Sequence, residues 1–281
     1  MEEDRKKPSD VRSEPAEEPE SDGMTRRDFL KAATVSAVAF AGAAVTAPVS
    51  AEHEGGPGSI RVKEGARWGM VVDTEKCVRA RACMMACKVE NNTPPGVDYN
   101  VTAEEARGIY PDVHHRYIFR PCNHCEYPPC TMVCPTSATF KRKEDGIVVV
   151  DYDYCIGCRY CIAACPYAAR SFDYGHYFYE PPAEFEKMPS PEYKENRVRE
   201  GLKPPVNTTR KCSFCLHRLS VGLAPACATA CPYDVIHFGD LNDPEAKCLV
   251  HGESMRELLR TRSSFRIKEE IGTEPNVYYL T

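Results

Sequence analysis

Fifteen of the sixteen cysteines in the 281-residue chain fall into four groups that recur along the sequence. Groups two, three and four each hold four cysteines and end in a Cys-Pro pair, whereas group one holds three. The members are Cys77, Cys83 and Cys87 in group one; Cys122, Cys125, Cys130 and Cys134 in group two; Cys155, Cys158, Cys161 and Cys165 in group three; and Cys212, Cys215, Cys227 and Cys231 in group four. This recurrence indicates an internal repeat of one small module.

The spacing within the groups is typical of iron–sulfur ligands. Group three reads C-x2-C-x2-C-x3-C before a proline, so three thiolates can hold one cubane while the fourth points away toward a second cluster. The groups are therefore expected to work in pairs. Zinc and disulfides are the other uses of a cysteine-rich chain, but this run is a poor tetrahedral zinc set. We predict a protein of the bacterial-ferredoxin type that carries electrons one at a time.

Short elements between the groups must position these cysteines. Residues 141–146 form a turn signal before the apolar run at 147–150, which predicts a β-hairpin leading into Cys155. Residues 88–120 and 171–210 interrupt the repeat, and we interpret them as surface insertions, either partner-binding or merely solvated. The predicted fold class is α+β, with tandem bacterial 2[4Fe-4S] ferredoxin-like modules and loop insertions.

The remaining composition points away from other functions. The net charge is −5 at pH 7, and residues 1–51 hold ten acidic and seven basic side chains, which leaves 29 basic against 31 acidic beyond them. Nothing in this balance suggests nucleic-acid binding. The sequence contains no nucleophile–His–acid arrangement, phosphate loop or dinucleotide fingerprint. We therefore predict a carrier that is not an enzyme on its own.

The N-terminus has the features of an export address. Residues 1–23 are polar and rich in Pro and Glu, and we expect them to be disordered. Arg26 and Arg27 then precede an apolar run at 32–47 that is short for a membrane span. We predict a twin-arginine signal with cleavage after Ala51, the alternatives being an uncleaved anchor or an ordinary helix. The predicted domains are 1–51, the signal with its acidic leader, and 52–281, the iron–sulfur domain, exported folded to the periplasm or the outer face of the cytoplasmic membrane.

Three stretches of sequence resemble a known family in residues other than the cysteines. Residues 212–218, 238–244 and 272–280, together with the four motifs in this order, resemble the electron-transfer subunits of complex iron–sulfur oxidoreductases. The match spans residues 68–280. The family includes the four-cluster subunits of DMSO, polysulfide and nitrate reductases, the ferredoxin of the multihaem nitrite reductase system, and the periplasmic ferredoxin of the Dsr/Hme membrane complex.

The resemblance implies that group one pairs with group four and group two with group three. The implied ligand sets are Cys122, Cys125, Cys130 and Cys165 (the group-two site); Cys155, Cys158, Cys161 and Cys134 (the group-three site); Cys212, Cys215, Cys227 and Cys87 (the group-four site); and Cys77, Cys83 and Cys231 (the group-one site). The group-one site departs from the family pattern, because Ala80 stands where the second cysteine of the group is usual. The resemblance thus implies three [4Fe-4S] clusters and a fourth site that is a [3Fe-4S] cluster, empty, or completed by an outside ligand.

The resemblance also implies partners. The expected function is electron transfer in a membrane-bound respiratory complex, between a quinone-reactive integral membrane subunit of the polysulfide-reductase type and a cytochrome c or other redox subunits. Ala80 and a signal carried by this chain itself favour the Dsr/Hme or nitrite-reductase type. The alternatives are a subunit of a molybdopterin oxidoreductase and a free soluble periplasmic polyferredoxin.

Two smaller expectations concern residues beside the motifs. Cys248 lies outside every group, and we interpret it as an unligated thiol. His217 and Arg218 follow Cys215 closely, and we expect them to donate hydrogen bonds to cluster sulfurs.

Overall fold

The computed structural model describes residues 65–281 except 192 and 194, all within one structural unit, Gly55–Thr281. The predicted export signal and the domain boundary after residue 51 lie outside the described residues. In chain order the elements are β1 (Trp68–Asp73), α2 (Ala82–Glu90), β2 (Asn100–Ile109), β3 (Asp112–Pro121), α3 (Pro129–Met132), β4 (Thr139–Lys141), β5 (Val148–Val150), α4 (Tyr160–Ala163), β6 (Ser171–Phe172), the 3-10 helix η1 (Glu184–Lys187), β7 (Ser190–Pro191), β8 (Asn196–Arg197), β9 (Thr209–Arg210), α5 (Leu216–Leu219), α6 (Ala226–Thr229), β10 (Ile236–Asp240), α7 (Met255–Thr261), β11 (Ser264–Phe265), the 3-10 helix η2 (Glu269–Ile271) and β12 (Val277–Leu280).

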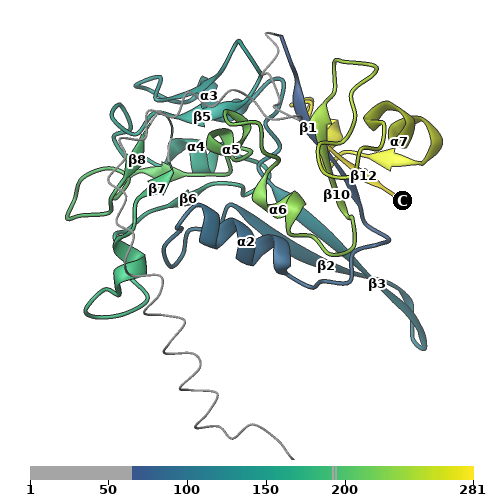
Figure 1. Cartoon of the computed structure of the whole chain (residues 1–281), viewed down its shortest axis with the longest axis horizontal. Helices are drawn as coiled ribbons and strands as arrows, with labels where there is room; N and C mark the ends of the chain where they lie inside the picture. The colour runs from purple at the N-terminus through teal and green to yellow at the C-terminus, as the bar shows by residue number, and fades with distance from the viewer. Residues whose placement is uncertain (1–64, 192, 194) are drawn as a thin grey trace, which may run out of the picture. The chain divides into compact units, whose positions relative to one another are not determined.

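The four-stranded sheet joins the two ends of the described chain. β1 lies between β10 and β12, antiparallel to β10 and parallel to β12, and β11 pairs with the other edge of β12 (Figure 1). Every residue of β1 is buried, as expected of an apolar run at the centre of a sheet. Gly69 is required there, because an added Cβ would lie only 2.6 Å from the Asn276 carbonyl oxygen.

The short helices near the cysteine groups pack in pairs. α2, which carries Cys83 and Cys87, contacts α6, which carries Cys227. α3, with Cys130, contacts α4, with Cys161. Packing thus brings group one beside group four and group two beside group three, the pairs that the family resemblance implies.

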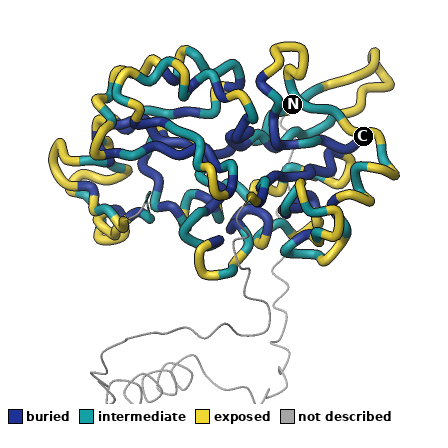
Figure 2. Tube along the Cα trace, turned by 90° about the horizontal axis from the view of Figure 1, so that it is seen from above, coloured by how far each residue is buried: buried dark blue, intermediate teal, exposed yellow. Residues whose placement is uncertain are grey.

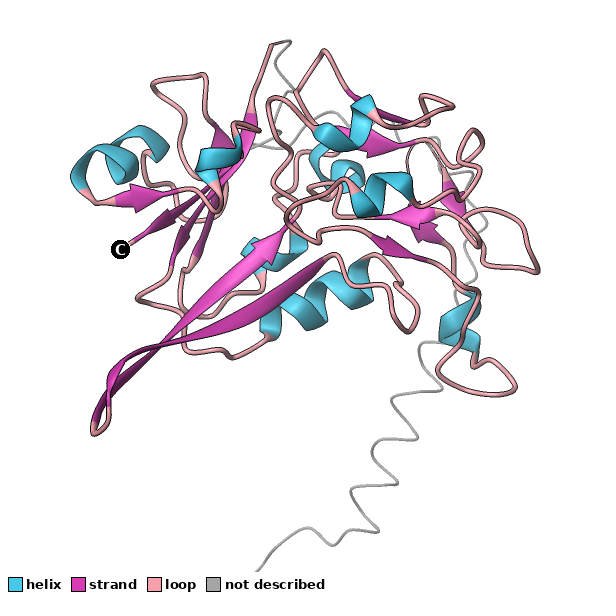
Figure 3. Cartoon of the chain, turned by 180° about the vertical axis from the view of Figure 1, so that it is seen from behind, coloured by secondary structure: helices cyan, strands magenta, loops and turns pink. Residues whose placement is uncertain are grey.

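The sequence predicts one of the two hairpins, β4–β5, but not the other, β2–β3. The predicted hairpin before Cys155 is confirmed, since β4 pairs with β5 from Thr139↔Val150 to Lys141↔Val148. The segment interpreted as a surface insertion at 88–120 instead begins in the last turn of α2 and continues into the ten-residue strands β2 and β3, which project as a hairpin in Figure 3. Both faces of its outer half are exposed, so these strands show no apolar alternation that would identify them.

The main hydrophobic core encloses part of the cysteine groups. Cys87, Cys122, Cys212 and Cys227 belong to it together with aromatic and aliphatic side chains of the four-stranded sheet and the group-four loop. Figure 2 shows the buried chain running through the interior and the exposed chain gathered in outer loops. Among the described residues, no helix has the length and apolar character needed to cross a bilayer.

Candidate iron–sulfur centres

All four cysteine groups share one backbone feature. The residue two positions after the first cysteine of each group has a left-handed φ, and these residues are Arg79 (61°), His124 (42°), Gly157 (68°) and Phe214 (55°). Only glycine adopts this region without a steric cost, so three of the four loops hold a conformation that their own side chains disfavour. The group-one loop therefore keeps the shape of a cluster-binding loop although Ala80 replaces its second cysteine.

The group-two site is assembled in the structure. Its members line one small cavity, and they are Cys122, Cys125, Cys130 and Cys165. Burial raises the pKa of Cys125 to about 12, and the negative charges of the other three thiolates add to the effect. Burial likewise raises the pKa of Cys130, so two of the four thiols resist ionisation unless a cation joins them.

The group-four site is assembled in the same way, although Cys87 comes from a distant part of the chain. A second small cavity is lined by Cys87, Cys212, Cys215 and Cys227. Burial raises the pKa of Cys212 to about 12, and the charges of Cys122 and Cys215 contribute. The Asn91 amide and the Phe214 backbone N–H donate to the sulfurs of Cys87 and Cys212, at 3.5 and 3.4 Å, which favours the thiolate forms.

Both cavities suit an iron–sulfur cluster. The donors are all sulfur, and the ligand of iron is the thiolate, which burial alone disfavours. A multiply charged iron cluster resolves this conflict, because its positive irons pair with the buried thiolates. The neighbouring prolines and apolar side chains exclude water from both sites.

The group-three site lies closer to solvent. Cys161 is buried beside Cys130 and Val148, whereas Cys158 is exposed. Burial opposes ionisation of Cys134, but the backbone N–H of Thr139 and donors around Thr136 outweigh it, so the pKa of Cys134 is lowered. Cys134 is therefore prepared to act as a thiolate ligand.

The group-one site contains three cysteines and an open corner. Burial raises the pKa of Cys83 to about 11, with the charges of Cys231 and Cys77 adding to it, so the structure brings the three residues together. Ala80 is exposed, as is Cys158 at the corresponding position of group three. Its neighbour Arg79 is paired with Glu104 of the β2–β3 hairpin. The fourth corner therefore faces solvent.

Charged side chains of each site act on groups of the next site, so the four sites form a continuous row. Arg170 lies near Cys161 of the group-three site and near Cys130 and Cys122 of the group-two site. The group-two site adjoins the group-four site, since the charge of Cys122 acts on Cys212. The group-four site in turn adjoins the group-one site, because Cys83 acts on both Cys87 and Cys227. The row has the solvent-accessible Cys158 at one end and Ala80 at the other.

Two buried basic side chains lie between the sites of this row, and the sequence analysis predicted neither. Arg170 is 6% exposed and Lys211 is 3% exposed. Burial works against the charge of Arg170, but the thiolates of Cys130, Cys161 and Cys122 outweigh it and raise its pKa. Lys211 acts on Cys130 and Cys212. The one feature of the sequence that could have indicated a cation beside a cluster is the position of Lys211 immediately before Cys212.

His217 and Arg218, which we expected beside cluster sulfurs, both contact Glu90 in the structure, and the charge of Arg218 also acts on Cys215. His217 Nε2 lies 2.9 Å from Glu90 Oε1, and Arg218 Nη1 donates to Glu90 Oε2 at 3.0 Å. Glu90 ends α2, so these contacts fasten the group-four loop to the helix that carries Cys87.

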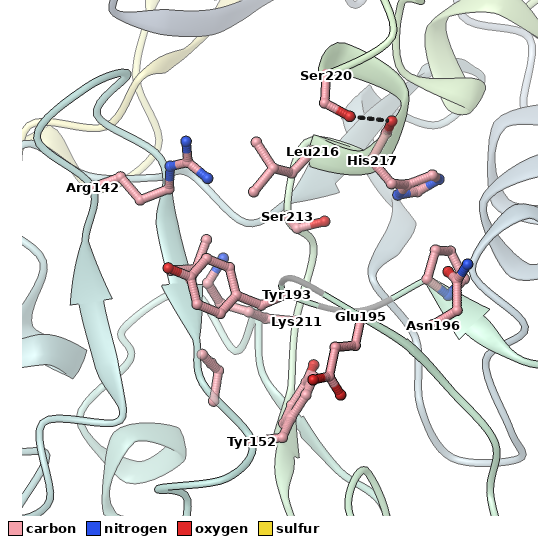
Figure 4. A pocket seen from close by; sticks show the side chains of 13 residues that line it. Arg142, Tyr152, Tyr193, Glu195, Asn196, Lys211, Ser213, Leu216, His217 and Ser220 are labelled. Atoms are coloured by element: carbon pink, nitrogen blue, oxygen red, sulfur yellow. Dashed lines mark hydrogen bonds between the residues drawn. The ribbon is translucent and has the colours of Figure 1, made fainter. Parts of the chain in front are cut away.

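A larger cavity of about 400 Å³ lies beside group four and contains no cysteine. Figure 4 shows Tyr193, Lys211 and Ser213 around it, with His217 and Ser220 on the helix above; the Ser220 hydroxyl donates to the His217 carbonyl oxygen at 2.8 Å. Lys211 and Ser213 flank Cys212, so a partner side chain in this cavity would lie next to the group-four site.

Comparison with known proteins agrees with the geometry. Two family models described as 4Fe-4S dicluster domains match residues 113–180 and 147–232. A selenate reductase subunit of Mesobacillus selenatarsenatis is 50% identical over 218 residues, which cover 76% of this chain and 72% of the relative. The chain belongs to the family of iron–sulfur subunits of respiratory reductases.

Other members of the family are similar over most of their length. The arsenate respiratory reductase iron-sulfur subunit ArrB of a Shewanella species is 38% identical, with 76% of this chain and 96% of the relative covered. The menaquinone reductase iron-sulfur cluster-binding subunit of Nitratidesulfovibrio vulgaris is 37% identical, with 76% and 89% covered. This reductase subunit is therefore an electron-transfer protein that binds iron–sulfur clusters. Group one lies outside both family-model matches.

The buried cation between two sites gives a first prediction. Replacing Arg170 with glutamine removes a positive charge that favours the added electron, so the reduction potentials of the nearest clusters should fall by about 60 mV or more, a tenfold change in the one-electron equilibrium. Redox titration followed by EPR measures the shift. The exposed cation Lys143 provides the matched control, and Lys143→Gln should shift the potentials by less than about 15 mV. Equal shifts in the two variants would contradict the role of Arg170.

The open corner gives a second prediction. A [3Fe-4S] cluster at the group-one site would take up one more iron in Ala80→Cys, because the added thiol supplies the ligand for a fourth corner. Native mass spectrometry of anaerobic protein should show a gain of one iron over the original chain. Ala80→Val, which adds bulk without a thiol, should show none. A gain of four irons would mean that the site is empty without the cysteine, and no gain would mean that the corner is already filled.

Proposed function

We propose that this reductase subunit carries electrons, singly, between a quinone-reactive integral membrane subunit and the catalytic subunit of a complex that reduces an oxyanion such as selenate. The observation that carries the proposal is the row of four cysteine sites with an accessible group at each end. The 50% identity with a selenate reductase subunit supports the oxyanion, and the menaquinone reductase relative supports a quinone partner. When bound, iron–sulfur clusters take up and release one electron each.

We propose the ligand sets implied by the resemblance, with [4Fe-4S] clusters at the group-two, group-three and group-four sites and a [3Fe-4S] cluster at the group-one site. The two cysteine-lined cavities support two of these sets directly. The exposure of Ala80 supports three irons at the group-one site, since no protein side chain is needed at a vacant corner. Cys77, Cys83 and Cys231 then supply all of the protein ligands.

An exposed apolar groove beside α2 supports the docking of a partner there. The groove, of about 480 Å³, includes Met85 and Val89 of α2 and Phe178, Phe185 and Met188 of the 171–210 segment. These five side chains are between 51% and 77% exposed, which is unusual for large apolar residues on a surface without a partner. A redox partner docked in the groove would lie against α2, the helix that carries Cys83 and Cys87.

A second candidate is the ferredoxin of a Dsr/Hme or multihaem nitrite reductase system, whose outer redox partner is a cytochrome c. Ala80 favours this candidate, because it alters the cluster that faces the catalytic subunit in the molybdenum-dependent relatives. The twin-arginine signal that we predict for this chain favours this candidate as well. The identity with the selenate reductase subunit outweighs both, because it extends over 218 residues.

Purification of the tagged chain from native membranes separates the candidates. We expect a stable complex with a large catalytic subunit and a membrane subunit, in which selenate reoxidises the quinol-reduced clusters. The bleaching and recovery of visible absorption measure this reaction, and a complex carrying Cys125→Ser should lose most of it. Co-purification with a cytochrome c and no catalytic subunit would replace the first candidate by the second. A monomer without stable partners would contradict both.

We also propose that the chain is exported with its clusters by the twin-arginine route. In Arg26→Lys combined with Arg27→Lys, the protein should accumulate in the cytoplasm with its iron bound, because only the export address has changed. Cell fractionation measures the distribution, and cleavage after Ala51 would give an exported chain that starts at Glu52. The matched control is Arg5→Lys with Arg12→Lys, outside the motif. Undiminished export of the first variant would contradict the proposal.

A further inference from the structure

Three metal-ligating side chains meet at a place that the cysteine groups do not reach. His237 lies on β10, and Cys248 and His251 lie in the turn between β10 and α7. One ligand atom from each lies within 4.8 Å of the other two. Cys248 packs with Val71 and Met255 in a hydrophobic cluster separate from those that contain the other cysteines.

The backbone holds the three residues in place. The Leu249 N–H donates to the Phe238 carbonyl oxygen at 2.9 Å, which fixes the turn beside β10. The Gly252 N–H donates to the Cys248 carbonyl oxygen at 2.9 Å and closes the turn that carries Cys248 and His251. After this turn the chain forms α7, which packs against β10 (Figure 1). The site is therefore built on fixed elements rather than on a free loop.

Two buried ring nitrogens at this place have no hydrogen-bond partner. They are His237 Nδ1, on a side chain that is 1% exposed, and His251 Nε2, on a side chain that is 14% exposed. Leaving a buried polar atom without a partner costs about 1–3 kcal/mol, so two such atoms cost about twice that. A metal ion bound to both nitrogens removes the cost.

Two carboxylates are placed as supporting groups. Asp234 Oδ1 lies 3.1 Å from His251 Nδ1, and a carboxylate on one ring nitrogen is the usual device that directs the other nitrogen to a metal. Glu253 Oε2 lies 3.1 Å from His237 Nδ1 but not in hydrogen-bond geometry. Two ligand atoms on a tetrahedral ion with bonds of 2.0–2.1 Å are separated by about 3.3 Å, which is close to this distance.

We propose that His237, Cys248 and His251 bind one zinc ion, with Glu253 or a water molecule as the fourth ligand. Imidazole and thiolate in a tetrahedral set of four are typical of zinc, and Cys-x2-His is a short spacing that one turn can supply. Zinc has no redox chemistry, so the ion stabilises the junction between β10 and α7 and carries no electron. Cys248 is then a metal ligand rather than the unligated thiol that the sequence suggested.

Metal analysis of the full chain purified with its clusters tests the proposal. Inductively coupled plasma mass spectrometry should find about one zinc per chain, and less than about a tenth of that in Cys248→Ser and in His251→Ala. Iron should stay unchanged in both variants, which shows that the rest of the protein remains folded. The exposed His114 provides the control, and His114→Ala should keep its zinc. Absence of zinc from the original chain, or equal zinc in the variants, would overturn the proposal.

X-ray absorption at the zinc edge distinguishes this site from zinc trapped in a cysteine group. The proposed ligands predict one sulfur and three nitrogen or oxygen atoms around the ion. A shell of three or four sulfurs would place the zinc at the group-one site or another cysteine group and would overturn the proposal. This measurement needs no variant, so a folding defect cannot obscure it.

Discussion

The described structure depends on one constraint: cysteines from distant segments of the chain must meet around the same cavity. In the proposed ligand sets each site takes its last cysteine from the partner group, as Cys165 joins group two and Cys87 joins group four. Helix pairs α2–α6 and α3–α4 hold these exchanges in place. Many strands are therefore only two or three residues long, because metal-bound cysteines supply cross-links that a larger sheet would otherwise provide.

The same constraint explains why charged side chains are buried near the cysteine sites. Clusters ligated by thiolates carry negative charge into an apolar interior, and Arg170 and Lys211 lie among them at almost no exposure. A third buried group, Asp173, pairs with Arg199 at 2.7 Å and with Arg210 at 3.1 Å. Arg210 pairs across strands with Ser171, so these contacts fasten both ends of the 171–210 segment. That segment is anchored in the core and is more than a surface loop.

The sequence predicted what local spacing can express. The cysteine groups and the hairpin at 139–150 agree with the structure because each depends on a short-range pattern. The pairing of the groups also agrees with the packing, but it came from the family resemblance and not from spacing. The β2–β3 hairpin escaped prediction because its exposed outer half has no apolar alternation. Arg170 and the Glu90 contacts escaped because they join segments that are about 10 to 130 residues apart. The nearness of His237 and Cys248 escaped because it depends on the hydrogen bond from the Leu249 N–H to the Phe238 carbonyl oxygen, which no local pattern predicts.

The state of the group-one site tests the account most directly. EPR of the anaerobically purified chain, as isolated and after mild oxidation, should show nearly one spin of the oxidised [3Fe-4S] type per chain, with about 15 irons in total. Such a result would establish four cysteine-bound sites, three complete and one with a vacant corner. The absence of that signal, with only about 12 irons per chain, would mean that Cys77, Cys83 and Cys231 hold no cluster and would contradict the four-site row.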